Sequence, residues 1–227
     1  LFRSAALSNW DAGMDMYIYG KLGNLTMTKE GINVLMTNLT GKVPPILQRL
    51  DYIRFNGEAA GYLHDLTLTG LFHTGAGMVK TDVMMSIDEQ SMSRTYSGSV
   101  ASADLDLGKL LNQEKKFGKV DFNVELKGFN YKNRYPESYI KGIISSFEYS
   151  QYQYENIMLD GVYKDGGFNG RLSMDDANGS VQIDGNFNVA KTIPDFNLKA
   201  SVKNLRPHDL HLSDKYENAS ISLGLTA

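Results

Sequence analysis

The 227-residue chain contains no cysteine, which excludes disulfide frameworks, thiolate metal sites and cysteine nucleophiles together. Positive charge is not in excess either, because 23 Lys and Arg stand against 26 Asp and Glu. Binding to nucleic acid needs a basic surface patch, and no cluster of Lys and Arg stands out, so we expect no nucleic-acid partner. No run of about 20 apolar residues occurs, and we therefore expect no segment to cross a bilayer as a helix.

Motifs that carry chemistry are also scarce. His208 and His211 have the spacing of two metal ligands on one helical turn, but no further ligands follow at conventional spacing. Asp176 could open a calcium loop, yet Val181 stands where such a loop needs Gly and Phe187 where it needs Glu. No serine lies in a G-x-S-x-G elbow. We therefore expect no enzymatic activity, no cofactor and no metal ion.

What the chain does have is alternation of apolar and polar residues, which is the pattern of a β-strand with one buried face. The clearest run is Val120–Lys127, and Phe168–Met174, Val181–Val189 and Phe196–Val202 follow it closely. Weaker alternation predicts further strands at Met14–Tyr19, Leu25–Thr28, Ile32–Met36, Leu66–Leu71, Val79–Ile87, Tyr96–Leu105 and Ile157–Tyr163.

Turn-forming residues separate these runs, most clearly at Lys164–Gly167 and Asp175–Gly179. Asn178-Gly179 supplies the positive φ angles of a tight hairpin turn. Only Pro45–Leu50 and Leu107–Glu114 have a helical pattern, and both are short. Because no crossover helix of adequate length separates the strands, we expect an all-β fold with one long antiparallel sheet of about a dozen strands.

The sequence also contains an internal repeat. Ile53–Gly61 aligns with Val120–Gly128, with Phe, Asn, Glu and Gly identical, and each copy follows one of the two helical segments. A third lead-in begins at Asn204–Pro207. We therefore expect residues 1–227 to form one continuous repetitive β-module with unit boundaries near 104 and 204. The chain begins without Met and ends within a strand pattern, so we expect it to be an internal fragment of a longer protein.

Several segments carry a resemblance to a known family through their order along the chain. They are Asp104–Leu111, Phe117–Gly128, Tyr152–Gly161, Phe168–Asp176 and Pro194–Ala200, preceded by Val43–Gly61 and Asp65–Met84. In this order they resemble the TamB/AsmA-like family of Gram-negative envelope proteins, and the resemblance covers nearly the whole chain. No single motif among them is specific.

The resemblance implies a fold and a function. Members of this family are anchored in the inner membrane and reach across the periplasm, and their long β-sheet is rolled into a U-shaped, β-taco-like trough with an apolar interior. They are associated with moving phospholipid to the outer membrane, and TamB-type members with assembling outer-membrane proteins beside a barrel partner. For this chain the resemblance implies two or three short helices, a periplasmic location, and an inner-membrane anchor outside the fragment.

The residues and the resemblance agree on one physical point: a single sheet of this length must cover its apolar face by curling, closing or binding something. We predict that this face lines a conduit for phospholipid acyl chains. Methionines such as Met14, Met16, Met84, Met158 and Met174 suit a surface that adapts to mobile chains. The predicted lining residues are Val120, Phe122, Val124, Leu126, Phe168, Leu172, Val181, Ile183, Phe187, Phe196 and Leu198.

Three alternatives stay open at this point. Without the resemblance, the residues alone favour a dry sandwich core, in which the same side chains fill the space between two sheets. Within the family, the chain could be a scaffold that guides outer-membrane β-barrel strands by edge pairing. In another class, it could be an extracellular adhesin or binding module whose exposed tyrosines Tyr149, Tyr152 and Tyr154 bind a protein or glycan.

Overall fold

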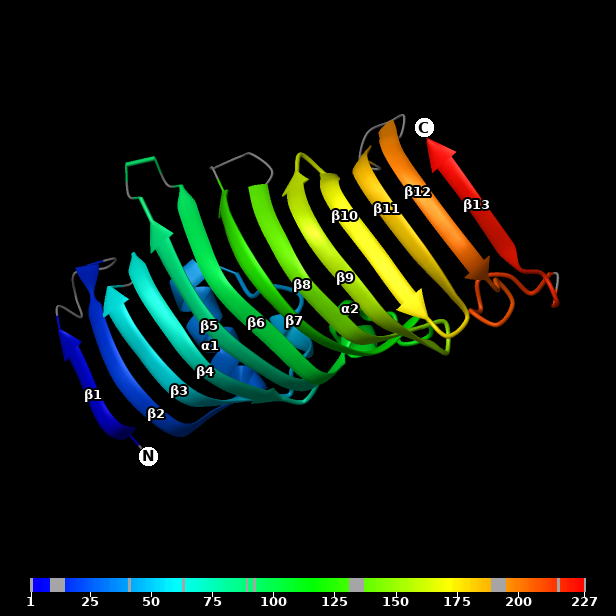
Figure 1. The fold of residues 1–227 in the computed structure, drawn as a ribbon. Helices are drawn as coiled ribbons and strands as arrows, with labels where there is room; N and C mark the ends of the chain where they lie inside the picture. Colours follow the sequence, from blue (N-terminus) through cyan, green and yellow to red (C-terminus); the bar gives the residue numbers. More distant parts are fainter. Residues whose placement is uncertain are drawn as a thin grey trace.

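The computed structural model describes residues 2–8, 15–40, 42–62, 64–88, 90–91, 93–130, 137–188, 195–215 and 217–226. These residues form one 13-stranded sheet in which the strands follow one another in sequence order. Neighbouring strands are antiparallel throughout, as in the meander that Figure 1 shows from the N-terminal to the C-terminal strand. The sheet is not closed, because β1 and β13 lie at its opposite ends. The predicted all-β antiparallel fold is therefore confirmed.

The elements have the following bounds, in chain order. The strands are β1 (Phe2–Ser8), β2 (Tyr17–Thr28), β3 (Tyr52–Tyr62), β4 (Asp65–Thr74), β5 (Gly77–Ile87), β6 (Arg94–Asp106), β7 (Phe117–Asn130), β8 (Glu137–Tyr149), β9 (Tyr152–Lys164), β10 (Gly167–Asp176), β11 (Gly179–Asn188), β12 (Asp195–Leu205) and β13 (Ile221–Thr226). The helices are α1 (Lys29–Thr40), the 3-10 helix η2 (Leu47–Arg49) and α2 (Leu107–Leu111). None of the described helices combines the length and hydropathy that crossing a membrane requires.

One predicted strand is a helix. Ile32–Met36 was expected to be extended, but it lies inside α1. Ile32 and Met36 are four residues apart and therefore share one face of that helix, where Ile32 is 2% exposed and Met36 packs against the core. A short apolar run fits both the two-residue period of a strand and the 3.6-residue period of a helix, and burial against the sheet decided for the helix.

The two predicted helical segments are helical over part of their length. Within Pro45–Leu50 only η2 forms. α2 begins after Asp106, whose Oδ1 accepts a hydrogen bond of 2.8 Å from the backbone N–H of Lys109. It ends at Asn112, which has a φ of 58°, so the helix is shorter than the predicted Leu107–Glu114.

Pairing register divides the sheet into two faces, because residues directly opposite each other in antiparallel strands project to the same side. Val124, for example, is paired with Val100 on one side and with Gly142 on the other. Following such pairs from strand to strand gives a face that is apolar from β2 to β13, which we call the apolar face. The intervening residues, such as Glu125, form the polar face.

Three strands, β2, β6 and β12, contain a residue with positive φ at a register shift before the strand ends. These residues are Asn24, Asp104 and Asn204, with φ of 60°, 53° and 50°. At each, the register with the next strand shifts between Leu22 and Leu25, between Ser102 and Leu105, or between Val202 and Leu205. Asn and Asp tolerate this conformation better than other side-chain-bearing residues. The expected unit boundaries near 104 and 204 lie at two of these bulges, and the division into units stays a prediction.

After each bulge a short segment packs against one end of the apolar face, and we call these segments caps. The first cap is α1 with η2, the second is α2, and the third is the turn at residues 206–213. Figure 1 shows α1 and α2 on the same side of the sheet, and the strands bowed along their length. The main hydrophobic core lies between the first two caps and the sheet, and its buried residues are Ile32, Leu50, Ile53, Ala76, Leu105, Leu110 and Val120.

Candidate functional site: the apolar face of the sheet

All the predicted lining residues lie on the apolar face. Leu126 is paired with Gly98 and Ile140, and the same row continues through Gly161, Gly170 and Gly185 to Leu198. The neighbouring row holds Val124, Leu172 and Ile183, and the other predicted residues occupy rows on either side. Along β7, Phe122 is half-buried while Asn123 and Glu125 are exposed. The predicted alternation therefore separates the two faces correctly.

One end of the apolar face is covered. We call its outermost row the capped row, and Ile53, Leu105 and Val120 in it are 9%, 8% and 6% exposed. Leu110 of α2 and Ile32 of α1 belong to the same buried cluster, at 7% and 2% exposed. These side chains already have protein partners, so Val120 is a core residue rather than a free lining residue.

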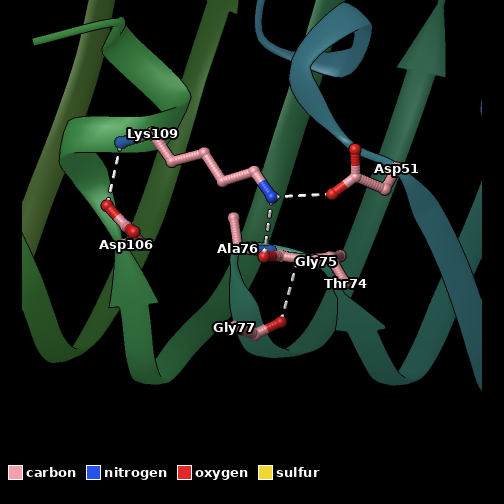
Figure 2. A network of polar contacts seen from close by, with 7 residues as sticks. All are labelled: Asp51, Thr74, Gly75, Ala76, Gly77, Asp106 and Lys109. Atoms are coloured by element: carbon pink, nitrogen blue, oxygen red, sulfur yellow. Dashed lines mark hydrogen bonds and ion pairs between the residues drawn. The ribbon is translucent and has the colours of Figure 1, made fainter. Parts of the chain in front are cut away.

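A lysine fastens the two helical caps to each other and to the sheet (Figure 2). Lys109 Nζ of α2 lies 2.7 Å from Asp51 Oδ2, which follows the first cap, and donates a second hydrogen bond of 3.1 Å to the carbonyl of Gly75 in the β4–β5 turn. The hydrogen bond from Lys109, with its positive charge, lowers the pKa of Asp51 below its usual range. In the same turn, Thr74 Oγ1 donates 2.9 Å to the carbonyl of Gly77 and accepts 3.1 Å from the N–H of Ala76.

The third cap covers the start of β9. Leu210 at its centre is fully buried, and its carbonyl accepts a hydrogen bond of 2.7 Å from Tyr154 Oη. Burial raises the pKa of Tyr154 above its usual range. His211 Nδ1 lies 2.9 Å from the carbonyl of Ser150, which ties the cap to the β8–β9 turn.

Tyr152 lies beside Tyr154 under the third cap and contacts the β10–β11 turn. Its hydroxyl donates a hydrogen bond to Asp176 Oδ1 and accepts one of 3.1 Å from Asn178 Nδ2. Burial, followed by the hydrogen bond to the Asp176 carboxylate, raises the pKa of Tyr152 to about 12. The ring of Tyr152 lies 4.8 Å from that of Tyr154, between their centroids.

The expectation that the tyrosine cluster is exposed is wrong. Tyr154 is 7% exposed, and Tyr149 and Tyr152 are half-buried. They pack with Phe147 against the apolar face, with centroid distances of 6.5 Å from Tyr149 to Tyr154 and 6.3 Å from Phe147 to Tyr154. The rings lie close together at the end of β8 and the start of β9, beside the third cap. They are therefore core residues rather than a binding surface.

The opposite end of the apolar face ends in an aromatic row. Register pairing joins Tyr96 through Gly128 and Ser138 to Tyr163, and the row continues through Phe168 and Phe187 to Phe196. We call these aromatic residues the rim row. Tyr96 and Ser138 share a hydrogen bond between their hydroxyls, and the rings of Phe168 and Phe187 lie 5.7 Å apart. Phe196 is 50% exposed, and the other aromatic residues of the rim row are half-buried.

Between the two ends, aromatic rings lie across glycines of neighbouring strands. A Cβ added to Gly161 would lie 2.5 Å from Cζ of Phe168, and one added to Gly70 would lie 2.6 Å from Cε2 of Phe55. The missing side chains let these rings lie flat on the sheet, an arrangement known to stabilise β-structure around glycine. The middle of the apolar face is therefore smooth and continuous.

The polar face carries a charge ladder that sequence analysis missed. Glu125, Lys141, Asp160, Arg171, Asp184 and Lys199 are paired in that order across successive strands. Lys141 Nζ lies 3.4 Å from Asp160 Oδ2, and Arg171 Nη2 lies 2.8 Å from Asp184 Oδ2. The Asp160 carboxylate raises the pKa of Lys141, and through a hydrogen bond that of Tyr139. Only the register brings these charges into one row, so the sequence alone offered no signal for it.

Two methionines that were expected on the apolar face lie on the polar face. Met84 and Met158 are paired with Ser97 and Ile143 on the polar face, and each is 52% exposed. The expectation that they serve the apolar surface is therefore wrong, whereas Met174 does lie on the apolar face, paired with Val181. Met158 and Ile143 instead line a shallow depression of about 510 Å³ beside the charge ladder. Met14 lies outside the described residues.

Among the described residues, no cluster of three or more His, Asp and Glu side chains could hold a metal ion. Comparison with protein-family models, with curated proteins and with solved structures finds no significant match. The candidate site is therefore identified from geometry alone, as the apolar face with the capped row at one end and the aromatic rim row at the other.

Proposed function

We propose that this chain is a segment of a lipid-conducting envelope protein, and that its apolar face binds phospholipid acyl chains and guides them along the sheet between the inner and outer membranes. The observation that carries the proposal is the nearly continuous apolar register from β2 to β13. Most pairing steps join an apolar or glycine position to another, and the polar interruptions include Thr81, Ser102 and Ser138.

The exposure of apolar side chains on this face supports the proposal that it binds a ligand. Leaving apolar area in water costs about 25 cal/mol per Å², and extended apolar patches on soluble proteins mark binding surfaces. Phe196, Leu223 and Leu225 are 50%, 46% and 51% exposed on one face of β12 and β13. Acyl chains lying along the sheet would cover this area.

A dry sandwich core fits the structure less well. All described strands belong to one sheet, so no second sheet faces the apolar surface within the described residues. The caps cover only one end of the face. The bowed strands in Figure 1 favour a U-shaped, β-taco-like trough with the apolar face inside, and we propose this shape for the conduit.

The cellular setting follows from the resemblance to the TamB/AsmA-like family. We propose that the segment lies in the periplasm and belongs to a longer protein anchored in the inner membrane. On this proposal the polar face, with its charge ladder, is in contact with water. A charged outer face and an apolar inner face are the arrangement that a lipid path through an aqueous compartment requires.

The decisive experiment compares two neighbouring residues of β11. A benzoylphenylalanine crosslinker at Ile183 should capture radiolabelled phospholipid from vesicles of phosphatidylethanolamine and phosphatidylglycerol, because this side chain lies on the apolar face. The same crosslinker at Asp184 should capture little, because that side chain lies in the charge ladder. Equal capture at both positions, or none at either with the fold intact by circular dichroism, would refute the proposed function.

A substitution tests the same point without a crosslinker. Ile183→Asp places a carboxylate in the middle of the path and should abolish lipid capture at flanking apolar positions such as Leu172. Gln182→Asp, one residue away on the polar face, is the matched control and should leave capture unchanged. A variant that captures lipid normally despite the Ile183→Asp change would show that acyl chains do not pass this row.

A further inference from the structure

We propose that two copies of this chain associate through their polar faces, related by a two-fold axis that runs parallel to the strands between β9 and β10. The interface is built on the charge ladder, which the lipid path does not use. In the free monomer this face is in contact with water. Both apolar faces point away from such an interface, so the inference goes beyond the proposed function and does not depend on it.

The order of charges in the ladder is self-complementary. From β7 to β12 the sign alternates at every strand, in the order Glu125, Lys141, Asp160, Arg171, Asp184 and Lys199. In the reverse direction, the same row has the opposite sign at every position. A two-fold axis through its midpoint therefore places a positive charge opposite every negative one, and the partner that fits this row is a second copy of the chain. The facing pairs are Asp160 with Arg171, Lys141 with Asp184, and Glu125 with Lys199 of the second copy.

The ladder lies where a second copy can reach it. Ile143 and Met158 are the central residues of β8 and β9, and Lys141 and Asp160 are two positions away from them, so the ladder is far from the turns at the strand ends. The caps pack on the other face of the sheet, where Figure 1 shows α1 and α2 together. The side chains of the two central ion pairs of the ladder are 49–61% exposed.

Apolar side chains beside the ladder also support a covered surface. Cross-strand pairing within one sheet accounts for the alternating charges, but not for Ile143 and Met158, which are 49% and 52% exposed on the polar face. They line the depression of about 510 Å³ next to Lys141 and Asp160. The two-fold axis places Gln182 of the second copy over Ile143, and its Ser173 over Met158. Each large apolar side chain thus faces a smaller or amide side chain, and its covering removes apolar area from water.

The symmetry also fits the shape of the sheet. A two-fold axis along the strands turns a twisted sheet into one with the same twist, so the two faces stay evenly spaced on both sides of the axis. Because the strands are bowed, we count only the ladder and one row on either side of it. Six strands about 4.8 Å apart and three rows about 7 Å apart give an area of roughly 600 Å² on each copy. This area is at the lower end for specific interfaces, so we expect a weak, reversible dimer.

Sedimentation velocity of the full chain measures the association. We expect a monomer–dimer equilibrium whose dissociation constant rises at least tenfold from low to high ionic strength, because salt screens charge pairs at the edge of a small interface. A chain that stays monomeric at millimolar concentration and low ionic strength would overturn the proposal.

Charge reversal at the centre of the ladder identifies the interface. Asp160→Lys and Arg171→Glu each place like charges opposite one another twice in the symmetric dimer, so each variant alone should dimerise at least tenfold more weakly than the wild type. An equimolar mixture of the two variants should regain dimerisation, because the two reversed residues then face each other. Asp82→Lys is the matched control: Asp82 lies in the same row on β5, beyond the overlapping strands, and its reversal should leave dimerisation unchanged.

The mixture keeps the test independent of folding. Circular dichroism checks each variant, and association of the mixture itself requires both components to be folded. Equal dimerisation by the wild type and both variants would place the interface elsewhere and overturn the proposal. A mixture that associates no better than its separate components would overturn it as well.

A short bismaleimide tests the position of the axis. The chain has no cysteine, so Ile143→Cys and Gln182→Cys each introduce a single thiol. A mixture of these two variants should be linked into a dimer, because the two positions face each other. Ile143→Cys alone should not be linked, since its two thiols would be three strands apart, about 14 Å. Linkage of Ile143→Cys to itself but not to Gln182→Cys would require a different axis and overturn the proposed arrangement.

Discussion

The two ends of the apolar face are built from the same strands and differ in what lies on them. Val120, at the capped end of the face, is 6% exposed, whereas Phe196 at the rim is 50% exposed. Both follow the same alternation of apolar and polar residues, so alternation assigns a side chain to a face but does not determine its burial. Burial at the capped end comes from the caps, which follow the strands that contain the bulges of Asn24, Asp104 and Asn204. The difference shows how one sheet can hold a buried core beside more exposed apolar side chains.

The sharpest way to test this comparison is to remove leucine side chains at its two extremes. Leu210→Ala should lower the free energy of unfolding by about 2–5 kcal/mol, because it leaves a cavity at a fully buried site. Leu225→Ala removes the same atoms from a side chain that is 51% exposed on the uncovered face, and should cost about 1 kcal/mol or less. Urea denaturation measures both. Similar losses would mean that the third cap does not distinguish the two ends.

A smaller effect is expected at Tyr152, under the third cap. Tyr152→Phe removes the hydrogen bonds to Asp176 and Asn178 and should cost about 1 kcal/mol. In the wild type the pKa of Tyr152 is raised to about 12, so its contribution to stability is complete below the ordinary tyrosine pKa and is lost as pH rises toward that value. Absorbance titration at 295 nm should show several late-ionising tyrosines, because the pKa values of Tyr139 and Tyr154 are raised as well, and the variant should have one fewer. An unchanged number of late-ionising tyrosines in the variant would assign the shift to another residue.

The ion pair between Lys109 and Asp51, which we call the clasp between the first two caps, should contribute less to stability at acid pH. The pKa of Asp51 is lowered by Lys109, so the clasp stabilises the fold above the ordinary aspartate pKa and is lost as pH falls through the lowered value. Asp51→Asn should therefore reduce the melting temperature slightly at neutral pH and make no difference once the carboxyl is protonated. Scanning calorimetry across the acid range measures this. A difference between the two proteins that stays constant with pH would exclude the charged clasp as its cause.

The weakest effect is expected on the polar face. Arg171 and Asp184 are 61% and 53% exposed, and Arg171→Gln should change the free energy of unfolding by only about 0–1 kcal/mol, less at high salt. Urea denaturation at low and high ionic strength measures the change. Lipid capture at Ile183 should stay the same, since that side chain projects from the other face. A loss of capture would connect the charge ladder to lipid binding, contrary to the proposal.

The alternation of apolar and polar residues, with a period of two, made the sheet and its two faces predictable. In Val120–Lys127 every second residue is apolar, and all the predicted lining residues fall on one face as a result. The β10–β11 hairpin was placed correctly, but the predicted turn geometry is wrong. Asp176 pairs with Gly179, so Ala177 and Asn178 form the loop, and of Asn178 and Gly179 only Gly179 has a positive φ, of 136°. Both features depend on neighbours in the sequence, so they needed no tertiary information.

Other elements could not be found in this way. β8 was missed because Ile143 and Ile144 are consecutive apolar residues that lie on opposite faces, paired with Asn123 and Phe122, which interrupts the alternation. α1 was mistaken for a strand because the spacing of Ile32 and Met36 serves a helix as well as an extended chain. The charge ladder was invisible because its members are far apart in the sequence and meet only through pairing.

By itself, the sequence determined that this chain forms an antiparallel sheet with one apolar face, because side-chain alternation and turn chemistry are local properties of the backbone. Only the tertiary structure decided which part of that face is core and which part is open. The caps are short segments whose helical or turn conformation depends on packing against the sheet, and side chains such as Leu210 become buried only when the cap and the sheet meet. Long-range packing therefore gave a uniform pattern of alternation two ends that differ in burial.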